Sequence, residues 1–146
     1  MFRTLDDQML VSPQISAADV VTARAEGVTL IINNRPDGEA PDEPQGPEIE
    51  AAAKAAGLDY RAIPVGQGGF SQPQVDAMAD ALDGAEGRVL AYCRSGTRST
   101  LLWSLACAKL GDDPDDLRAK AQAVGYDLAP VTTLLDMLAG RQVGGR

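Results

Sequence analysis

The chain contains no histidine among its 146 residues, and this absence removes several classes of enzyme. Cys-His hydrolases, Ser-His-Asp triads and the usual zinc sites all require an imidazole. Only two cysteines are present, Cys93 and Cys107. A chain of this length can bury a sizeable core without covalent staples, so we expect one domain over residues 1–146.

Long apolar runs are also missing. No stretch approaches the ~20 residues needed to cross a bilayer, and residues 1–10 lack the apolar segment of a signal peptide. These features predict a cytoplasmic protein with no membrane partner. The net charge is −8, which opposes binding to nucleic acid. An anionic substrate would need a local positive pocket.

Residues 92–99, YCRSGTRS, form the most informative segment of the chain. A buried strand is predicted at 88–92, so Cys93 enters a short loop that leads into an apolar helix from Thr97. Backbone N–H groups and the helix dipole favour an anion at such a helix start. With Arg94 and Arg98, the same field should hold Cys93 as a reactive thiolate. Gly96 can adopt a positive φ that turns successive amides inward.

A lone cysteine after a strand is more often a small buried hydrophobe than a nucleophile. Two arginines within five residues of Cys93 are hard to bury without an anionic partner, and this favours the functional interpretation. Cys107 would lie about 15 Å farther along the following helix than Thr97. We therefore predict that Cys107 packs in the core and forms no disulfide with Cys93.

The loop CRSGTRS resembles the active-site loop of rhodanese-type sulfurtransferases and, more loosely, that of cysteine-based protein phosphatases. Four residues separate Cys93 from Arg98, whereas the phosphatase signature has five. The segments 31–39 (IINNRPDGE), 62–65 (AIPV) and 101–103 (LLW) are similar to the beta-lactamase hydrolase-like phosphatase-like domains. This resemblance covers nearly the whole chain and implies a fold like that of dual-specificity phosphatases.

The pattern of strands and helices predicts an α/β domain with a central, mostly parallel sheet of four to five strands and helices on both faces. It is expected to be cysteine-phosphatase-like. The predicted strands are 9–12, as a weak edge strand, 28–33, 59–65 and 88–92. The predicted helices are 17–26, capped by Ser16, then 48–56, 71–82, 97–110, 114–124 and 130–139. Residues 35–47, rich in proline and acidic residues, are predicted to be an exposed loop.

Parallel sheets bind ligands at the carboxyl ends of their strands, so the loops 34–39, 66–70 and 93–98 should surround one crevice. The predicted catalytic residues are Cys93 and Arg98. The predicted substrate-binding residues are Arg94, Ser95, Gly96, Thr97, Ser99, Arg35 and Asp37, with Glu39 as a further candidate. Simple pairing of Arg35 with acidic neighbours in its loop is left open. No metal or cofactor is expected.

Two reactions suit a thiolate in an anion-binding loop. A phosphatase also needs an acid to protonate the leaving group. The family resemblance places that acid on the loop after the third strand, yet residues 65–70 contain no carboxylate. Asp37 or Glu39 could substitute from the neighbouring loop. Sulfur transfer expels stable anions and needs no acid, and the shorter loop also fits it. The sequence therefore favours sulfur transfer through a Cys93 persulfide over phosphomonoester hydrolysis through a phosphocysteine.

The partners follow from these reactions. Sulfur transfer implies a small anionic sulfur donor and a thiol acceptor, whereas a phosphatase would take a phosphoester. Relatives fused to a persulfide dioxygenase domain suggest such an enzyme as a partner. A third class also stays open, in which the loop is a redox-sensing or anion-binding module, because an exposed thiolate oxidises readily.

Overall fold

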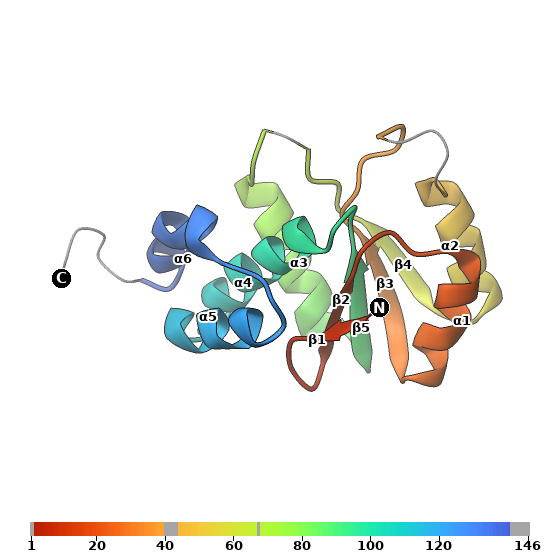
Figure 1. The fold of residues 1–146 in the computed structure, drawn as a ribbon, viewed down its shortest axis with the longest axis horizontal. Coiled ribbons are helices and arrows are strands. Elements are labelled where there is room, and N and C mark those ends of the chain that lie inside the picture. Colours follow the sequence, from red (N-terminus) through yellow and green to blue (C-terminus); the bar gives the residue numbers. More distant parts are fainter. Residues whose placement is uncertain (1, 40–43, 67, 141–146) are drawn as a thin grey trace.

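The centre of the protein is a five-stranded sheet with the strand order β1–β2–β5–β3–β4 (Figure 1). The computed structural model describes residues 2–39, 44–66 and 68–140. The strands are β1 (Arg3–Thr4), β2 (Met9–Ser12), β3 (Val28–Asn33), β4 (Asp59–Ala62) and β5 (Arg88–Tyr92). The last four are mutually parallel, whereas β1 pairs antiparallel to β2.

The helices form two layers, one on each face of the sheet (Figure 1). On one face lie α1 (Ala17–Ala25) and α2 (Gly46–Ala55). On the other lie α3 (Gln72–Gly84), α4 (Thr97–Lys109), α5 (Pro114–Ala123), a 3-10 turn η1 (Ala129–Val131) and α6 (Thr132–Leu138). Two buried apolar clusters correspond to the two faces, and the larger one includes the core residue Trp103.

Local sequence explains most of these elements. The β-branched run 28–33 forms β3 and is almost entirely buried, as expected for a strand covered on both faces. Helix α1 begins with a capping box, in which the Asp19 carboxylate accepts the Ser16 N–H at 2.8 Å. No helix within the described residues is both long and apolar enough to cross a membrane.

Three predictions differ from the structure by more than shifts of one or two residues at helix ends. Strand β2 was expected at an edge, but the two-residue strand β1 pairs with its outer side, and all four residues of β2 are buried. Strand β4 ends at Ala62 rather than Val65, although Ile63 and Val65 still donate backbone hydrogen bonds of 2.9 Å to the Asn33 and Asn34 carbonyls. The predicted helix 130–139 is divided into η1 and α6.

The strand register brings the carboxyl ends of the parallel strands together. Tyr92 lies opposite Ser12 on one side and Asn33 on the other, and Asn33 lies opposite Ala62. Backbone hydrogen bonds continue this row: Asn34 N–H donates to the Tyr92 carbonyl at 2.9 Å. The segments that follow β2, β3, β4 and β5 therefore meet at one end of the sheet.

Candidate active site

The cysteine loop joins β5 to α4 and has the geometry of an anion cradle. Gly96 has φ 89° and is the N-cap of α4, so the chain reverses in a conformation that favours glycine. Its N–H donates to Cys93 Sγ at 3.1 Å. Cys93 itself is buried, and its N–H donates to the Ser12 carbonyl at 3.3 Å. The sulfur thus lies beside a backbone donor at the start of a 13-residue helix.

The two loop arginines have different environments. Arg94 is exposed, whereas the Arg98 side chain on the first turn of α4 is only 23% exposed. Arg98 Nη1 donates to the Val65 carbonyl at 2.6 Å, which ties α4 to the segment after β4. Hydrogen bonding to Glu39 raises the pKa of the Arg98 guanidinium, and the nearby Cys93 side chain contributes in the same direction.

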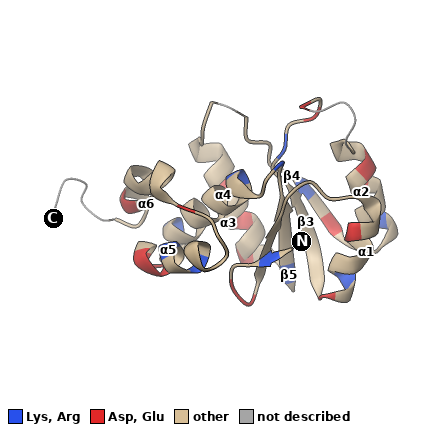
Figure 2. Ribbon diagram, in the orientation of Figure 1, with Lys and Arg blue, Asp and Glu red and all other residues tan. Residues whose placement is uncertain are grey.

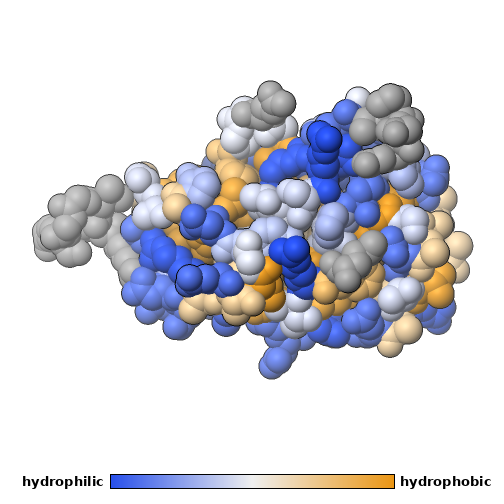
Figure 3. Space-filling view, viewed as in Figure 1, coloured by the Kyte–Doolittle hydropathy of each residue, from blue (hydrophilic) through white to orange (hydrophobic). Residues whose placement is uncertain are grey.

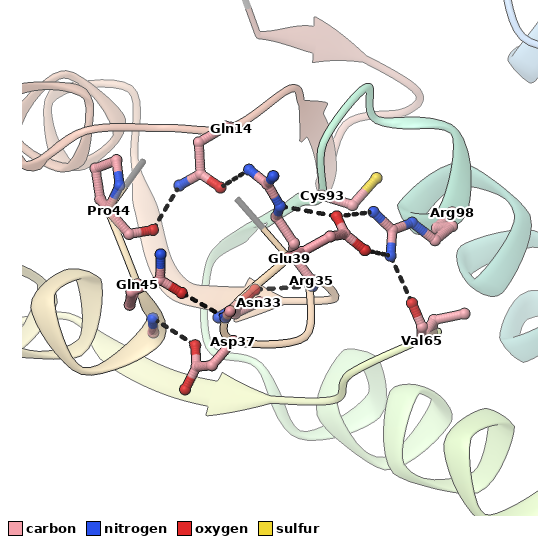
Figure 4. A network of polar contacts seen from close by, with 12 residues as sticks. Gln14, Asn33, Arg35, Asp37, Glu39, Pro44, Gln45, Val65, Cys93 and Arg98 are labelled. Carbon is pink, nitrogen blue, oxygen red and sulfur yellow. Dashed lines mark hydrogen bonds and ion pairs between the residues drawn. The ribbon is translucent and has the colours of Figure 1, made fainter. Parts of the chain in front are cut away.

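Glu39 is the centre of the polar network in Figure 4, between two guanidinium groups. Its Oε1 accepts from Arg98 Nη2 at 2.7 Å and from Arg35 Nε at 2.8 Å, and its Oε2 accepts from Arg98 Nη1 at 2.9 Å. These bonds, with that of Arg98 the strongest cause, hold the pKa of the Glu39 carboxyl below its ordinary value despite partial burial.

The burial of the Arg35 side chain differs from the sequence prediction. Residues 35–47 were predicted to be exposed, yet Arg35 is only 6% exposed. Its Nη1 donates to Gln14 Oε1 at 2.8 Å, and its N–H donates to Asn33 Oδ1 at 2.8 Å. Pairing of Arg35 with an acidic loop neighbour, left open above, does occur through Glu39. This buried arginine fixes the loop that carries Glu39.

Asp37 points away from the cysteine loop. Its Oδ1 accepts the Gly46 N–H at 2.7 Å, at the start of α2 (Figure 4). A carboxylate at this position compensates unsatisfied N–H groups and the helix dipole. Asp37 therefore acts on the fold of its own loop, and its predicted role in substrate binding stays a prediction.

The remaining loop residues divide by exposure. Ser95 and Thr97 are exposed, and their hydroxyl groups hydrogen-bond to each other at 3.0 Å. Ser99 is fully buried, and its Oγ has no hydrogen-bond partner among the described residues. Ser99 is therefore closed to solvent, whereas Ser95 and Thr97 are open to it. The predicted catalytic and substrate-binding roles of all the loop residues, including Cys93 and Arg98, remain predictions.

Sequence reasoning missed two residues that support the site. Tyr126, after α5, donates through its hydroxyl to the Ser95 carbonyl at 3.0 Å, and a Cβ at Gly96 would overlap that hydroxyl. Gln14, after β2, holds Arg35 and also donates to the Pro44 carbonyl at 3.4 Å. Neither residue belongs to a local motif, so only the tertiary fold reveals it.

Cys107 is buried in the larger apolar cluster, and both cysteines are free. Burial raises the pKa of the Cys107 thiol to about 12. The predicted packing role of Cys107 thus agrees with its surroundings. In the described part of the chain, no cluster of three or more acidic or cysteine side chains could hold a metal ion.

Charge at this end of the sheet is positive against an acidic background. Lys and Arg segments lie where β3 ends and where α4 begins, while Asp and Glu are spread over outer helices and loops (Figure 2). On the face in Figure 3, hydrophilic residues gather over this end of the sheet. In the loops 34–39 and 93–98 three arginines stand against Asp37 and Glu39, so the net charge of −8 is offset there, and Glu39 is paired with two of those arginines.

Comparison with known proteins agrees with this geometry. The family described as "Beta-lactamase hydrolase-like protein, phosphatase-like domain" matches residues 1–110. The Beta-lactamase hydrolase-like protein of Xylella fastidiosa (strain 9a5c) is 33% identical over 136 residues, which are 92% of this chain and 32% of that protein. The chain thus spans about a third of the length of the curated relatives it matches.

Solved structures give the same result. A candidate phosphatase from Neisseria meningitidis Z2491 has a TM-score of 0.79 and 34% identity, covering 92% of this chain and 96% of that one. A candidate phosphatase from Shewanella putrefaciens CN-32 has a TM-score of 0.75 at 24% identity, covering 95% and 91%, and shows the fold alone. The predicted cysteine-phosphatase-like α/β fold is confirmed. The chain belongs to the family of beta-lactamase hydrolase-like protein phosphatase-like domains.

Proposed function

We propose that this domain hydrolyses phosphomonoesters through a phosphocysteine formed on Cys93. One observation carries the proposal: the Gly96 N–H donates to Cys93 Sγ at 3.1 Å at the start of α4, with Arg98 on the first turn of that helix. The thiol, a backbone donor and a guanidinium are then grouped at one helix start, an arrangement that suits phosphoryl transfer. The family match and the Neisseria structure support the same chemistry.

The reaction has two displacement steps. The Cys93 thiolate attacks phosphorus, the S–P bond forms and the bond to the leaving oxygen breaks. Loop amides and the Arg98 guanidinium stabilise the negative charge on the remaining phosphoryl oxygens. Water then attacks phosphorus, the S–P bond breaks, and phosphate leaves as the thiolate is restored.

Sulfur transfer, which the sequence alone favoured, becomes the second candidate. The observation that still favours it is the loop length, because only four residues separate Cys93 from Arg98. In that reaction a persulfide on Cys93 would replace the phosphocysteine, and a sulfur donor and a thiol acceptor would be the partners. The family match and the phosphatase-like structures support the phosphoester reading more strongly.

Hydrolysis of an aryl phosphate by the wild-type protein and by Cys93→Ser tests the proposal. We expect turnover in the wild type and none in Cys93→Ser, while Cys107→Ser serves as the matched control because Cys107 is buried in the core. Intact mass after exposure to thiosulfate examines the second candidate in the same preparation. A sulfur adduct on Cys93 without any Cys93-dependent phosphate release would reverse the order of the two readings.

A further inference from the structure

A cysteine phosphatase that releases an alkoxide needs a proton donor near the leaving oxygen. The sequence of residues 65–70 offers no carboxylate for this purpose. On the loop after β3, Asp37 and Glu39 are the acidic residues within the described part of the chain. Asp37 is engaged at the start of α2 by the Gly46 N–H. Glu39, in contrast, lies against Arg98 of the cysteine loop's helix (Figure 4).

We propose that Glu39 is the proton donor to the leaving group, released for this role when a phosphoryl group binds to Arg98. This inference rests on the proposed phosphatase function. The structure then represents the ligand-free enzyme, in which the Glu39 carboxylate is paired with the Arg98 guanidinium that the substrate would bind. A phosphoryl dianion carries more charge than a carboxylate and therefore competes strongly with Glu39 for the N–H donors of Arg98.

The two carboxylate oxygens of Glu39 have different hydrogen-bond partners. This difference supports the replacement of Glu39 by the phosphoryl group at Arg98. Oε1 is bound by Arg35 Nε as well as by Arg98, whereas Oε2 accepts from Arg98 Nη1. Loss of Arg98 would leave Oε1 anchored on Arg35, which is buried and braced by Gln14. Oε2 would then face the bound phosphoryl group, in position to carry a proton.

The charges around Glu39 also favour its role as a proton donor once substrate is bound. The charged groups that face the carboxylate are Arg35 from its own loop and Arg98 from α4, and Arg98 is also close to Cys93. Arg98 is the largest cause of the low pKa of Glu39. When the phosphoryl group occupies Arg98 and brings its own negative charge, the pKa of Glu39 rises and the carboxyl takes up a proton.

The proton balance is complete over the two steps. As the thiolate attacks phosphorus, the proton of Glu39 Oε2 passes to the leaving oxygen, and the product is a neutral alcohol. In the second step the Glu39 carboxylate accepts a proton from the attacking water, whose oxygen bonds to phosphorus. When phosphate leaves, Glu39 pairs with Arg98 again and returns to solvent the proton that it took up on substrate binding, so the enzyme regains its starting state and no oxidant or reductant is needed.

The experiment compares two substrates in the full chain. One is an aryl phosphate, whose phenolate leaves without help, and the other an alkyl phosphate, whose alkoxide needs a proton. We expect Glu39→Gln to lower kcat/KM, which reports the steps up to loss of the leaving group, by about 10²-fold or more on the alkyl phosphate and by no more than several-fold on the aryl phosphate. Asp37→Asn, which removes the other loop carboxylate, should change both substrates by the same factor.

The remaining outcomes each decide the question. Equal losses of kcat/KM on both substrates in a folded Glu39→Gln protein would overturn the acid role and assign Glu39 to the positioning of Arg98. Unchanged turnover of both would overturn any role of Glu39. Wild-type turnover of the aryl phosphate without the alkyl phosphate would defeat this inference and leave the proposed function standing. Absence of activity on both substrates would overturn the proposed function itself.

Discussion

The Tyr126 hydroxyl donates a hydrogen bond of 3.0 Å to the Ser95 carbonyl, and so joins the segment after α5 to the middle of the cysteine loop. Arg3 of β1 in turn lies over the Tyr126 ring, 4.9 Å from its centroid, and donates to the Val124 carbonyl at 2.9 Å. The two ends of the described chain thus brace the loop that carries Cys93. Tyr126 lies beyond residues 1–110, where the family match ends.

Tyr126→Phe should weaken this brace. Loss of the hydrogen bond should lower the free energy of unfolding by about 1 kcal/mol and reduce kcat/KM several-fold, because the Ser95 peptide loses its fixed orientation. Urea unfolding and steady-state kinetics measure the two effects. Tyr60→Phe is a matched control, since its hydroxyl also has a 3.0 Å hydrogen bond, to Asn33 Nδ2. A similar kinetic loss in Tyr60→Phe would contradict a specific role for Tyr126.

Gly96→Ala should damage the loop for two reasons. Its φ of 89° disfavours any Cβ by about 1 kcal/mol, and the added methyl group would also overlap the Tyr126 hydroxyl. Gly57→Ala bears the same backbone cost at φ 80° but meets no atom within 4 Å. We expect a small stability loss in Gly57→Ala and a larger one, with loss of turnover, in Gly96→Ala. Equal thermal shifts in the two variants would argue against the close approach of Tyr126.

Stability at low pH should depend on Glu39. Its carboxyl has a lowered pKa in the folded protein, so the unfolded state binds more protons below the ordinary value of 4.5. The stabilisation from this group is therefore present above pH 4.5 and is lost as the pH falls through the folded pKa. Urea midpoints between pH 7 and acid conditions should fall less steeply in Glu39→Gln than in the wild type. Parallel curves would show that the contacts with Arg98 and Arg35 contribute nothing to folding.

Stability at high pH should depend on Cys107. Burial raises the pKa of its thiol to about 12 from an ordinary 9.0, so the folded state holds the proton where the unfolded state loses it. Stability should fall as the pH rises from 9 to 12, by up to about 1.4 kcal/mol per pH unit from this group. Cys107→Ser should remove that part of the slope and keep turnover largely intact. Loss of turnover in a folded Cys107→Ser protein would contradict its assignment to the core.

The sequence predicts those parts of the fold that depend on local patterns. The strands 28–33 and 88–92 are found at the predicted residues because each is a continuous apolar run between turn signals. The Cys93 loop follows from its glycine and its helix start. The two-residue strand β1 has no comparable signal, and it exists only because β2 offers an edge to pair with.

The supporting contacts of the site depend on long-range packing and could not be predicted. The pairing of Glu39 with Arg98 joins residues 59 positions apart, and Tyr126 meets Ser95 across 31 positions. The burial of Arg35 reverses the expectation from its proline-rich surroundings, because Gln14 and Glu39 together satisfy its charge. Residue type alone suggested Arg35, Glu39 and Arg98 as candidates, whereas Tyr126 and Gln14 were not predicted and are placed at the site by the tertiary fold.

The most direct test of the central claim is to trap the intermediate. Wild-type protein mixed with an aryl phosphate and quenched in acid within its first turnovers should gain the mass of one phosphoryl group. Peptide mapping should locate that group on the Cys93 thiol, and Cys93→Ser should show no adduct. Phosphate release that persists in Cys93→Ser, or a wild-type protein that is turning over with no phosphoryl group on Cys93, would contradict the account.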